Sequence, residues 1–151
     1  MKKYVLVFLM AVIFIGTMIH FGCKKSDSIV ENPLWGAKWI LEAIQYSDQN
    51  IVLIRRPFSL LFKQDGTVDM VVDCNECFGT YEVGDNGSLS FLDHGSCTEV
   101  FCGDDSNDDA FHAALDTASR YEIIGRSLRI FFNNGQSRLN YTAEDIARNS
   151  K

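Results

Sequence analysis

From residue 58 onward, apolar and polar residues alternate along most of the chain. Apolar side chains occupy every second position over 58–62 and again over 68–72, and Asp65-Gly66 stands between the two runs. Successive side chains of a β-strand point to opposite faces, so a period of two is typical of a strand with one buried face. Two such runs around Asp-Gly predict a β-hairpin.

The same alternation predicts the other strands. Runs at 81–83 and 89–91 enclose Asn86-Gly87, which predicts a second hairpin with these two residues as its turn. If Asp85 then faces Ser88, Cys77 lies opposite Ser96, one residue from Cys97. Further strands are expected at 39–41, 121–123, 128–132 and 139–141.

One segment has the period of a helix. Phe111, Ala114, Leu115 and Ala118 fall at i, i+3, i+4 and i+7, on one helical face. Ser106 or Asn107 can cap its start, and Asp108 and Asp109 favour the first turn through the helix dipole. The pattern as a whole predicts a mainly β (α+β) domain, a small antiparallel β-barrel of about eight strands with one helix.

The N-terminus has the layout of an export signal. Lys2-Lys3 precedes a nearly unbroken apolar stretch, 4–21, and Gly22-Cys23 is followed at once by polar residues. A cysteine directly after a small residue resembles a bacterial lipoprotein signal, although His20 and Phe21 depart from the usual lipobox. The resemblance implies cleavage before Cys23 and attachment of lipid to it. An uncleaved membrane anchor and plain secretion are the alternatives, because about 18 apolar residues can just span a bilayer.

These features divide the chain into four parts. Residues 1–22 are the predicted signal, 23–33 a lipidated tether, 34–142 the barrel and 143–151 a polar tail. Lys24, rather than Asp, follows Cys23, and by the sorting rule of the signals it resembles this implies the outer membrane. The domain is then expected to face the periplasm or the exterior.

The excess of acidic over basic residues argues against one class of partner, nucleic acids. The chain has 14 basic and 20 acidic residues, and two of the basic ones, Lys2 and Lys3, lie in the signal. An acidic domain without a basic stripe argues against nucleic-acid binding, which needs clustered Lys and Arg to neutralise phosphates.

Several short pieces, in order along the domain, resemble the META domain, also called the HslJ-like domain, of bacterial envelope proteins. The pieces are Leu34–Trp39, Phe62–Val68, Cys74-Asn75, Gly79–Tyr81, Thr98–Cys102, Phe111–Leu115 and Tyr121–Ile123, with Leu128 beyond. The resemblance implies a small barrel, lipocalin-like in shape, that is exported or attached to a lipoprotein signal. The family has no established catalytic residues, and its members are associated loosely with envelope stress and antimicrobial tolerance.

The chain departs from this family at two points. Asp73 stands where a glycine usually precedes the Cys-Asn pair, and Cys77 and Cys97 are additional cysteines. Because the family shares Cys74 and Cys102, the additional two are expected to pair with each other. A one-residue bulge in the second hairpin would bring Cys77 and Cys97 together.

The four domain cysteines allow three interpretations. An exported domain favours two structural disulfides, Cys74–Cys102 and Cys77–Cys97. The same residues can be drawn as a four-thiolate zinc site, or Cys74 and Cys77 as a redox Cys-x-x-Cys pair. A redox pair needs its first cysteine at a helix N-terminus, whereas a strand is predicted after Cys77. Structural disulfides are therefore the prediction.

The remaining polar residues favour no catalytic or metal site. The acidic segment Gly103–Asp109 could suggest calcium, but its spacing does not match an EF-hand loop. His94 and His112 are expected to be ordinary polar residues, since no spacing indicates a convergent triad. Trp35 and Trp39 could line a ligand mouth, although packing at the barrel entrance is the expected role.

The sequence therefore predicts a non-catalytic cell-envelope lipoprotein domain without cofactor, structural or protein-interacting, with an envelope protein as its possible partner. The alternative is a carrier of a small apolar ligand, because an eight-stranded barrel can enclose a cavity; an envelope enzyme is the third. The bulky alternating side chains favour a packed interior; they are Phe58, Phe62, Met70, Phe91 and Phe132.

Overall fold

A computed structural model describes residues 34–93 and 96–145. Within them the chain forms nine strands, one α-helix and a short 3-10 turn, η1 (Asp85–Gly87). The strands are β1 (Ala37–Gln45), β2 (Ile51–Leu53), β3 (Phe58–Phe62), β4 (Thr67–Val72), β5 (Asn75–Val83), β6 (Leu89–Asp93), β7 (Arg120–Ile124), β8 (Ser127–Phe132) and β9 (Ser137–Asp145). The helix is α2 (Asp108–Asp116).

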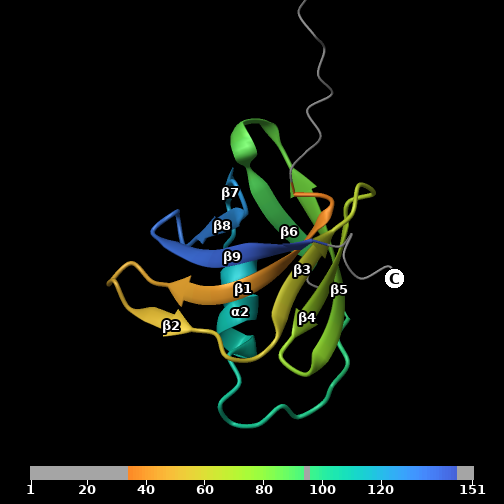
Figure 1. Ribbon diagram of the computed structural model, residues 1–151, viewed down its shortest axis with the longest axis vertical. Coiled ribbons are helices and arrows are strands. Elements are labelled where there is room, and N and C mark those ends of the chain that lie inside the picture. Colours follow the sequence, from red (N-terminus) through yellow and green to blue (C-terminus); the bar gives the residue numbers. More distant parts are fainter. Residues whose placement is uncertain (1–33, 94–95, 146–151) are drawn as a thin grey trace, which may run out of the picture. The chain divides into compact units, whose positions relative to one another are not determined.

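The strands form one antiparallel sheet that curls into a nearly closed barrel. Its order is β6-β5-β4-β3-β1-β9-β8-β7, and β2 pairs only with the end of β1. The two edges meet at a bridge between Ser88 and Arg120, where the Leu89 N–H also donates to the Ser119 carbonyl at 3.1 Å. Figure 1 shows β1 and β9 crossing the middle of the sheet between its two halves. The predicted fold class is confirmed.

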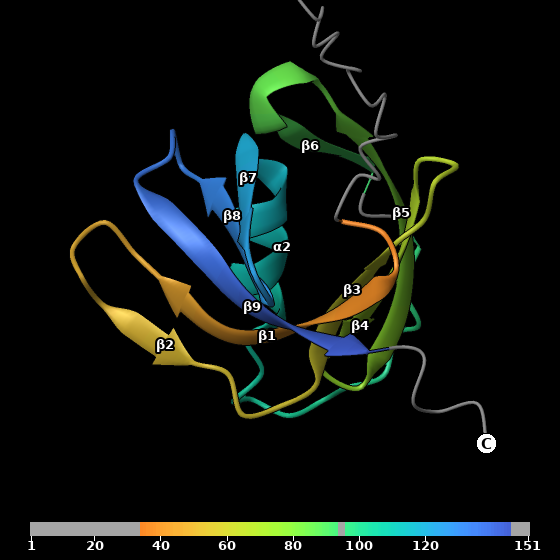
Figure 2. The same ribbon diagram turned by 45° about the horizontal axis from the view of Figure 1, so that its top comes forward.

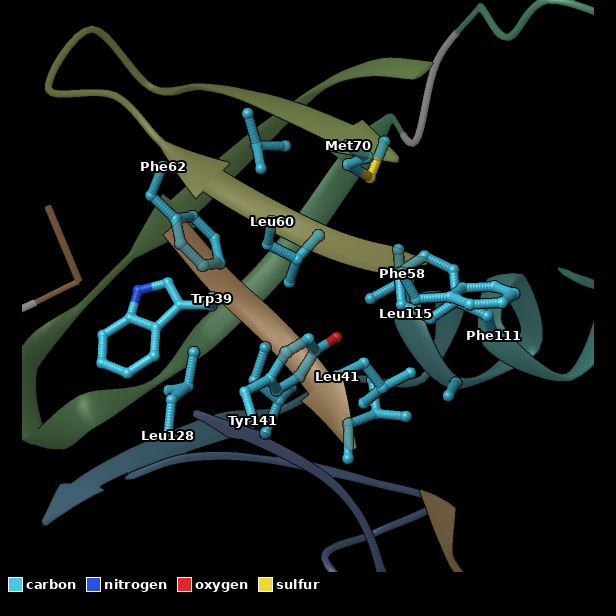
Figure 3. Close-up of a cluster of buried hydrophobic side chains, with 14 of the residues drawn as sticks. Trp39, Leu41, Phe58, Leu60, Phe62, Met70, Phe111, Leu115, Leu128 and Tyr141 are labelled. Atoms are coloured by element: carbon cyan, nitrogen blue, oxygen red, sulfur yellow. The ribbon is translucent and has the colours of Figure 1, made fainter. Parts of the chain in front are cut away.

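The interior follows the alternation of the sequence. Phe58, Leu60 and Phe62 on β3 point inward together with Val68, Met70 and Val72 on β4. Side chains from β1, β8, β9 and α2 meet them in one cluster (Figure 3), in which Trp39 and Tyr141 are each 2% exposed. Burial of this apolar surface is the main force that stabilises the fold.

The first hairpin forms as predicted. β3 and β4 pair in register, with Phe62 opposite Val68, around a turn in which Gly66 has φ +84°. The Oδ1 atom of Asp65 accepts hydrogen bonds from the Thr67 hydroxyl and N–H, and these bonds lower the pKa of Asp65. Glycine suits this turn because it adopts a positive φ without steric cost.

Both tryptophans pack as the sequence predicted. Trp39 lies in the core and its Nε1–H donates to the Leu34 carbonyl at 2.9 Å. Trp35 is half-buried, and its Nε1–H donates to the Tyr81 hydroxyl at 2.7 Å. That hydroxyl in turn donates to the Lys63 carbonyl at 2.6 Å. Burial raises the pKa of Tyr81, so the phenol remains the neutral donor that this chain of bonds requires.

The ends of the first and last strands differ from the prediction. β1 begins at Ala37 and has a bulge between Leu41 and Ala43 in its pairing with β9. Its end also pairs with β2, a short strand that the alternation did not predict. β9 runs to Asp145, three residues beyond the predicted end of the domain. Ala143 is 9% exposed and pairs with Trp39, so packing continues the strand into the segment predicted as a polar tail.

Helix α2 lies between the β7–β8 side and the β3–β5 side of the barrel (Figure 2). Its buried residues are Phe111, Ala114 and Leu115, as predicted, and the Phe111 ring packs edge-on against Phe58 at 5.2 Å. Asn107 is the N-cap by position, but the Ser106 hydroxyl is the group that accepts from the Asp108 N–H. Within residues 34–93 and 96–145, no helix combines the length and apolar character needed to cross a membrane.

Several predictions fall outside the described residues. They are the signal 1–22, the lipidation site Cys23 with the tether 23–33, His94, and the last six residues of the tail.

Candidate functional site

The segment Ser96–Cys102 lies along the first half of β5 and extends the sheet by one strand-like layer. The Phe78 N–H donates to the Ser96 carbonyl at 3.2 Å, and the Thr98 N–H donates to the Glu76 carbonyl at 3.0 Å. In Figure 1 the segment passes beside β5 before it turns toward α2. We call Ser96–Cys102 the clamped segment.

Two disulfides hold the clamped segment to β5. The structure joins Cys74 to Cys102 and Cys77 to Cys97, the two pairs predicted from the sequence. Cys77 and Cys97 face each other as a non-hydrogen-bonded antiparallel pair, with Cα atoms 4.1 Å apart. Cys77 is 1% exposed, so this bridge belongs to the wall of the core.

The route to this pairing differs from the prediction. The Gly84 N–H donates to the Ser88 carbonyl at 3.2 Å, and the Ser88 N–H donates to the Asp85 carbonyl at 3.4 Å. Gly84 and Ser88 therefore close a three-residue turn, η1, in which Asn86 and Gly87 both have positive φ. The two-residue turn was therefore wrong. A bulge at Thr80/Tyr81 shifts the register of β5 against β6 by one residue. A second one-residue shift, between Thr80 and Cys77, places Cys77 opposite Cys97.

Asn75 fastens the clamped segment through its side chain. Its Oδ1 accepts from the Val100 N–H at 2.8 Å and from the Thr98 hydroxyl at 2.9 Å, and its Nδ2 donates to the Val100 carbonyl at 3.0 Å. The amide thus gives Val100 both hydrogen bonds that a neighbouring strand would give. Asn75 is 9% exposed, which strengthens the need for these bonds.

Arg56 completes the clamp from the other side. Its Nη1 donates to the Cys102 carbonyl at 2.7 Å and to the Asp73 carboxylate at 3.2 Å, and its Nη2 donates to Asp105 at 2.5 Å. Asp73 is 3% exposed and has φ +57°, the backbone region that favours glycine. The substitution for the family's glycine therefore supplies a buried anion for Arg56.

The acidic residues that follow the clamped segment make different contacts. Asp105 is bound to Arg56, and the Oδ1 of Asp108 accepts from the Asp109 N–H at the start of α2. Three metal ligands come together elsewhere: Cys77, Cys97 and His112 have ligand atoms within 4.8 Å of one another. Because the two sulfurs are bonded to each other, they offer no thiolate for a metal in this state. That the chain binds no calcium stays a prediction.

A hollow of about 400 Å3 lies between the clamped segment and the first turn of α2. Residues from β5, the clamped segment and α2 line it, among them Cys77, Cys97, Glu99 and His112. Phe101 is 81% exposed and Val100 is 56% exposed at its rim. Burying a phenylalanine is worth about 2 kcal/mol, so leaving one exposed on a braced segment marks this surface as the candidate functional site.

Sequence reasoning found the cysteines of this site but not the residues that brace it. Asn75 carried a signal, because it belongs to the Cys-Asn piece of the family pattern. Arg56 and His112 carried none. Arg56 reaches Asp105 from 49 residues away, and His112 meets the Cys77–Cys97 bridge only because α2 docks there.

These features define a small antiparallel barrel domain with a filled core and a disulfide-clamped outer segment. Residues 32–145 match the META domain, and the chain belongs to this family, as the sequence pieces indicated.

Solved structures are similar in fold. A protein from Burkholderia xenovorans solved by NMR has a TM-score of 0.60 and 22% identity, with 74% of this chain and 84% of that chain covered. A DUF4847 family protein from Bacteroides vulgatus has a TM-score of 0.58 and 15% identity, with 77% and 98% covered. At these identities the likeness shows the fold alone. No curated protein matches the chain.

Proposed function

We propose that this chain is a non-catalytic lipoprotein of the bacterial cell envelope whose META barrel is structural or binds another envelope protein. The observation that carries the proposal is a filled interior combined with apolar side chains held outward on a braced surface. Phe58, Leu60 and Leu128 are fully buried in the core, whereas Phe101 is 81% exposed on the clamped segment. Exposed apolar groups on a rigid frame are typical of surfaces that contact another protein.

The proposed location rests on the sequence and on the disulfides. The apolar signal ends at Gly22-Cys23, and lipid on Cys23 would anchor the barrel, most simply to the outer membrane. Two disulfides suit an oxidising compartment such as the periplasm. Tolerance of envelope stress, with which the family is associated, is the proposed biological context.

A carrier of a small apolar ligand has less support. Trp39, Phe62 and Tyr141 occupy the space that a ligand inside the barrel would need (Figure 3). The hollow beside the clamped segment opens at the surface, as does a groove of about 280 Å3 outside β3–β5, lined in part by Leu61 and Phe78. A ligand enclosed by the barrel would require the core to rearrange.

Native mass spectrometry of the full chain purified from its own envelope tests the proposal. We expect a mass that starts at Cys23 with covalent lipid, four fewer hydrogens for two disulfides, and no further bound molecule. An apolar molecule bound at one per chain would support the carrier instead. An unprocessed N-terminus without lipid would contradict the lipoprotein assignment.

A further inference from the structure

The clamped segment is an open edge of the sheet. The carbonyl of Ser96 and the N–H groups of Thr98 and Val100 are bonded to β5. Alternate residues of a strand direct their backbone groups to opposite sides. Those of Cys97, Glu99 and Phe101 therefore point away from β5, and within the part of the chain that the structure describes no hydrogen bond uses them.

The residues along this edge are exposed from Thr98 to Phe101, so an added strand can reach it. Neighbouring strands lie about 4.8 Å apart, and a row of unpaired backbone groups is a template for pairing with another chain. The edge is also braced: two disulfides, the Asn75 amide and Arg56 hold it in position. A partner would consequently lose little free energy to ordering this surface.

The charges around the edge are negative. Glu99 lies in its centre, and Asp104, Asp108 and Asp109 follow it along the chain toward α2. Arg56, the cation packed against the segment, is already bound to Asp73 and Asp105. An incoming strand therefore meets uncompensated carboxylates, which favour a basic side chain.

The side chains of the edge define the pattern of the partner. Glu99 and Phe101 are two positions apart and so share one face of the segment. A strand paired with them places one side chain beside each, again two positions apart. A basic residue beside Glu99 and an apolar residue beside Phe101 would complement both.

We propose that the open edge at Cys97–Phe101 binds an extended basic segment of another envelope protein by strand addition. The inference rests on the proposed protein-interacting role and names the partner's chemistry. A second copy of the chain fits less well, because antiparallel pairing of two edges about Glu99 would place like charges side by side. An anionic membrane surface would likewise be repelled.

The test uses the full chain, 15N-labelled in detergent micelles, and a synthetic eight-residue peptide that alternates threonine with phenylalanine and lysine. We expect slowed exchange of the amides of Cys97, Glu99 and Phe101 when the peptide is added, because they become hydrogen-bonded. Glu99→Lys should weaken binding by about tenfold and favour a peptide with glutamate in place of lysine. Glu82→Lys, the same change on an exposed position of β5, should leave binding unchanged.

A second control is the lysine peptide with N-methyl groups on alternate amides, which cannot pair as a strand and should not bind. The inference is overturned if this peptide binds equally well, if the lysine peptide leaves the three amides unaffected at millimolar concentration, or if Glu99→Lys has no effect. It is also overturned if the same amides are protected by self-association or by anionic phosphatidylglycerol vesicles without peptide. Each of these outcomes would leave the covalent lipid and the ligand-free, filled barrel of the proposed function standing, since mass spectrometry measures those separately.

Discussion

Asp73 and Arg56 form an ion pair in which Arg56 compensates the charge of the buried Asp73 carboxylate. Asp73 is buried with φ +57°, and one of its carboxylate oxygens has no hydrogen-bond partner among the described residues. Arg56 supplies the compensating charge at 3.2 Å and also holds the Cys102 carbonyl. A buried charge whose partner is removed is strongly destabilising.

We therefore expect Arg56→Ala to lower the urea midpoint of unfolding more than Asp73→Gly does. Glycine accepts the positive φ and removes the buried charge, so Asp73→Gly should recover much of the loss when it is added to Arg56→Ala. A double-mutant cycle in urea measures this coupling. Strictly additive losses would show that the two residues stabilise the fold independently.

Tyr141 offers a second test at this scale. Its hydroxyl is buried without a hydrogen-bond partner among the described residues, and burial raises the pKa of the phenol well above its ordinary value. Tyr141→Phe removes a buried unsatisfied polar group and should stabilise the domain by about 1 kcal/mol. Tyr46→Phe, at a half-buried position, is the control.

The same residue predicts an alkaline loss of stability. The folded chain holds the Tyr141 proton more tightly than the unfolded chain does, so its contribution is complete below a pH of about 10, the ordinary pKa of tyrosine. It decreases as the pH rises above that value toward the raised pKa of the folded state. Urea unfolding between pH 8 and pH 11 should show a decline that is shallower in Tyr141→Phe, and an equal decline in both would contradict it.

Among the structural elements, the clamped segment depends on its two disulfides. The bridges close sequence separations of 28 and 20 residues, and each is expected to contribute about 3 kcal/mol in the chain-entropy model. Replacing Cys77 and Cys97 by alanine should lower the free energy of unfolding by at least this amount, because Cys77 is also part of the core. Replacing Cys74 and Cys102 should mainly release the clamped segment.

Non-reducing peptide mapping, followed by thermal unfolding of both double variants, checks this prediction. Fully oxidised cysteines in the pairs Cys74–Cys102 and Cys77–Cys97 are expected. A Cys74–Cys77 link would instead favour a redox pair. Free thiols that retain zinc would favour the metal interpretation. After reduction, Cys77, Cys97 and His112 are close enough together to bind such an ion.

The strands show what the sequence could and could not predict. The β3–β4 hairpin follows from alternation around Asp65-Gly66, because local turn chemistry and burial agree there. β2 is too short and too exposed to leave a periodic pattern, and it pairs only with the last three residues of β1. The η1 turn differs from prediction because Asp85, Asn86 and Gly87 together close it.

The site shows the same division. The cysteine pairs were reached by combining hairpin register with the family pattern. The contacts of Arg56 with Cys102 and Asp105 join residues 46 and 49 positions apart, so no local pattern could reveal them. Local periodicity determines the strands of this barrel, whereas the bracing of its outer segment depends on tertiary contacts.

For the whole molecule, the decisive question is whether the barrel is tethered. Residues 24–33 separate Cys23 from the first described residue, Leu34, so lipid on Cys23 would attach the domain through this short stretch. One acyl chain alone binds membranes only marginally, and stable anchoring requires more than one. Anchoring would also concentrate the open edge at Cys97–Phe101 near partners in the same envelope.

We therefore expect Cys23→Ser to abolish labelling by radioactive palmitate. The barrel should stay folded, since its core and both disulfides lie within residues 34–145. Ser26→Ala, in the polar stretch after the cysteine, is the matched control and should keep the label. Unchanged labelling of Cys23→Ser would rule out lipid on this residue. If the chain with Cys23 intact is unlabelled and still lies in the membrane fraction, an uncleaved apolar anchor at 4–21 is favoured instead.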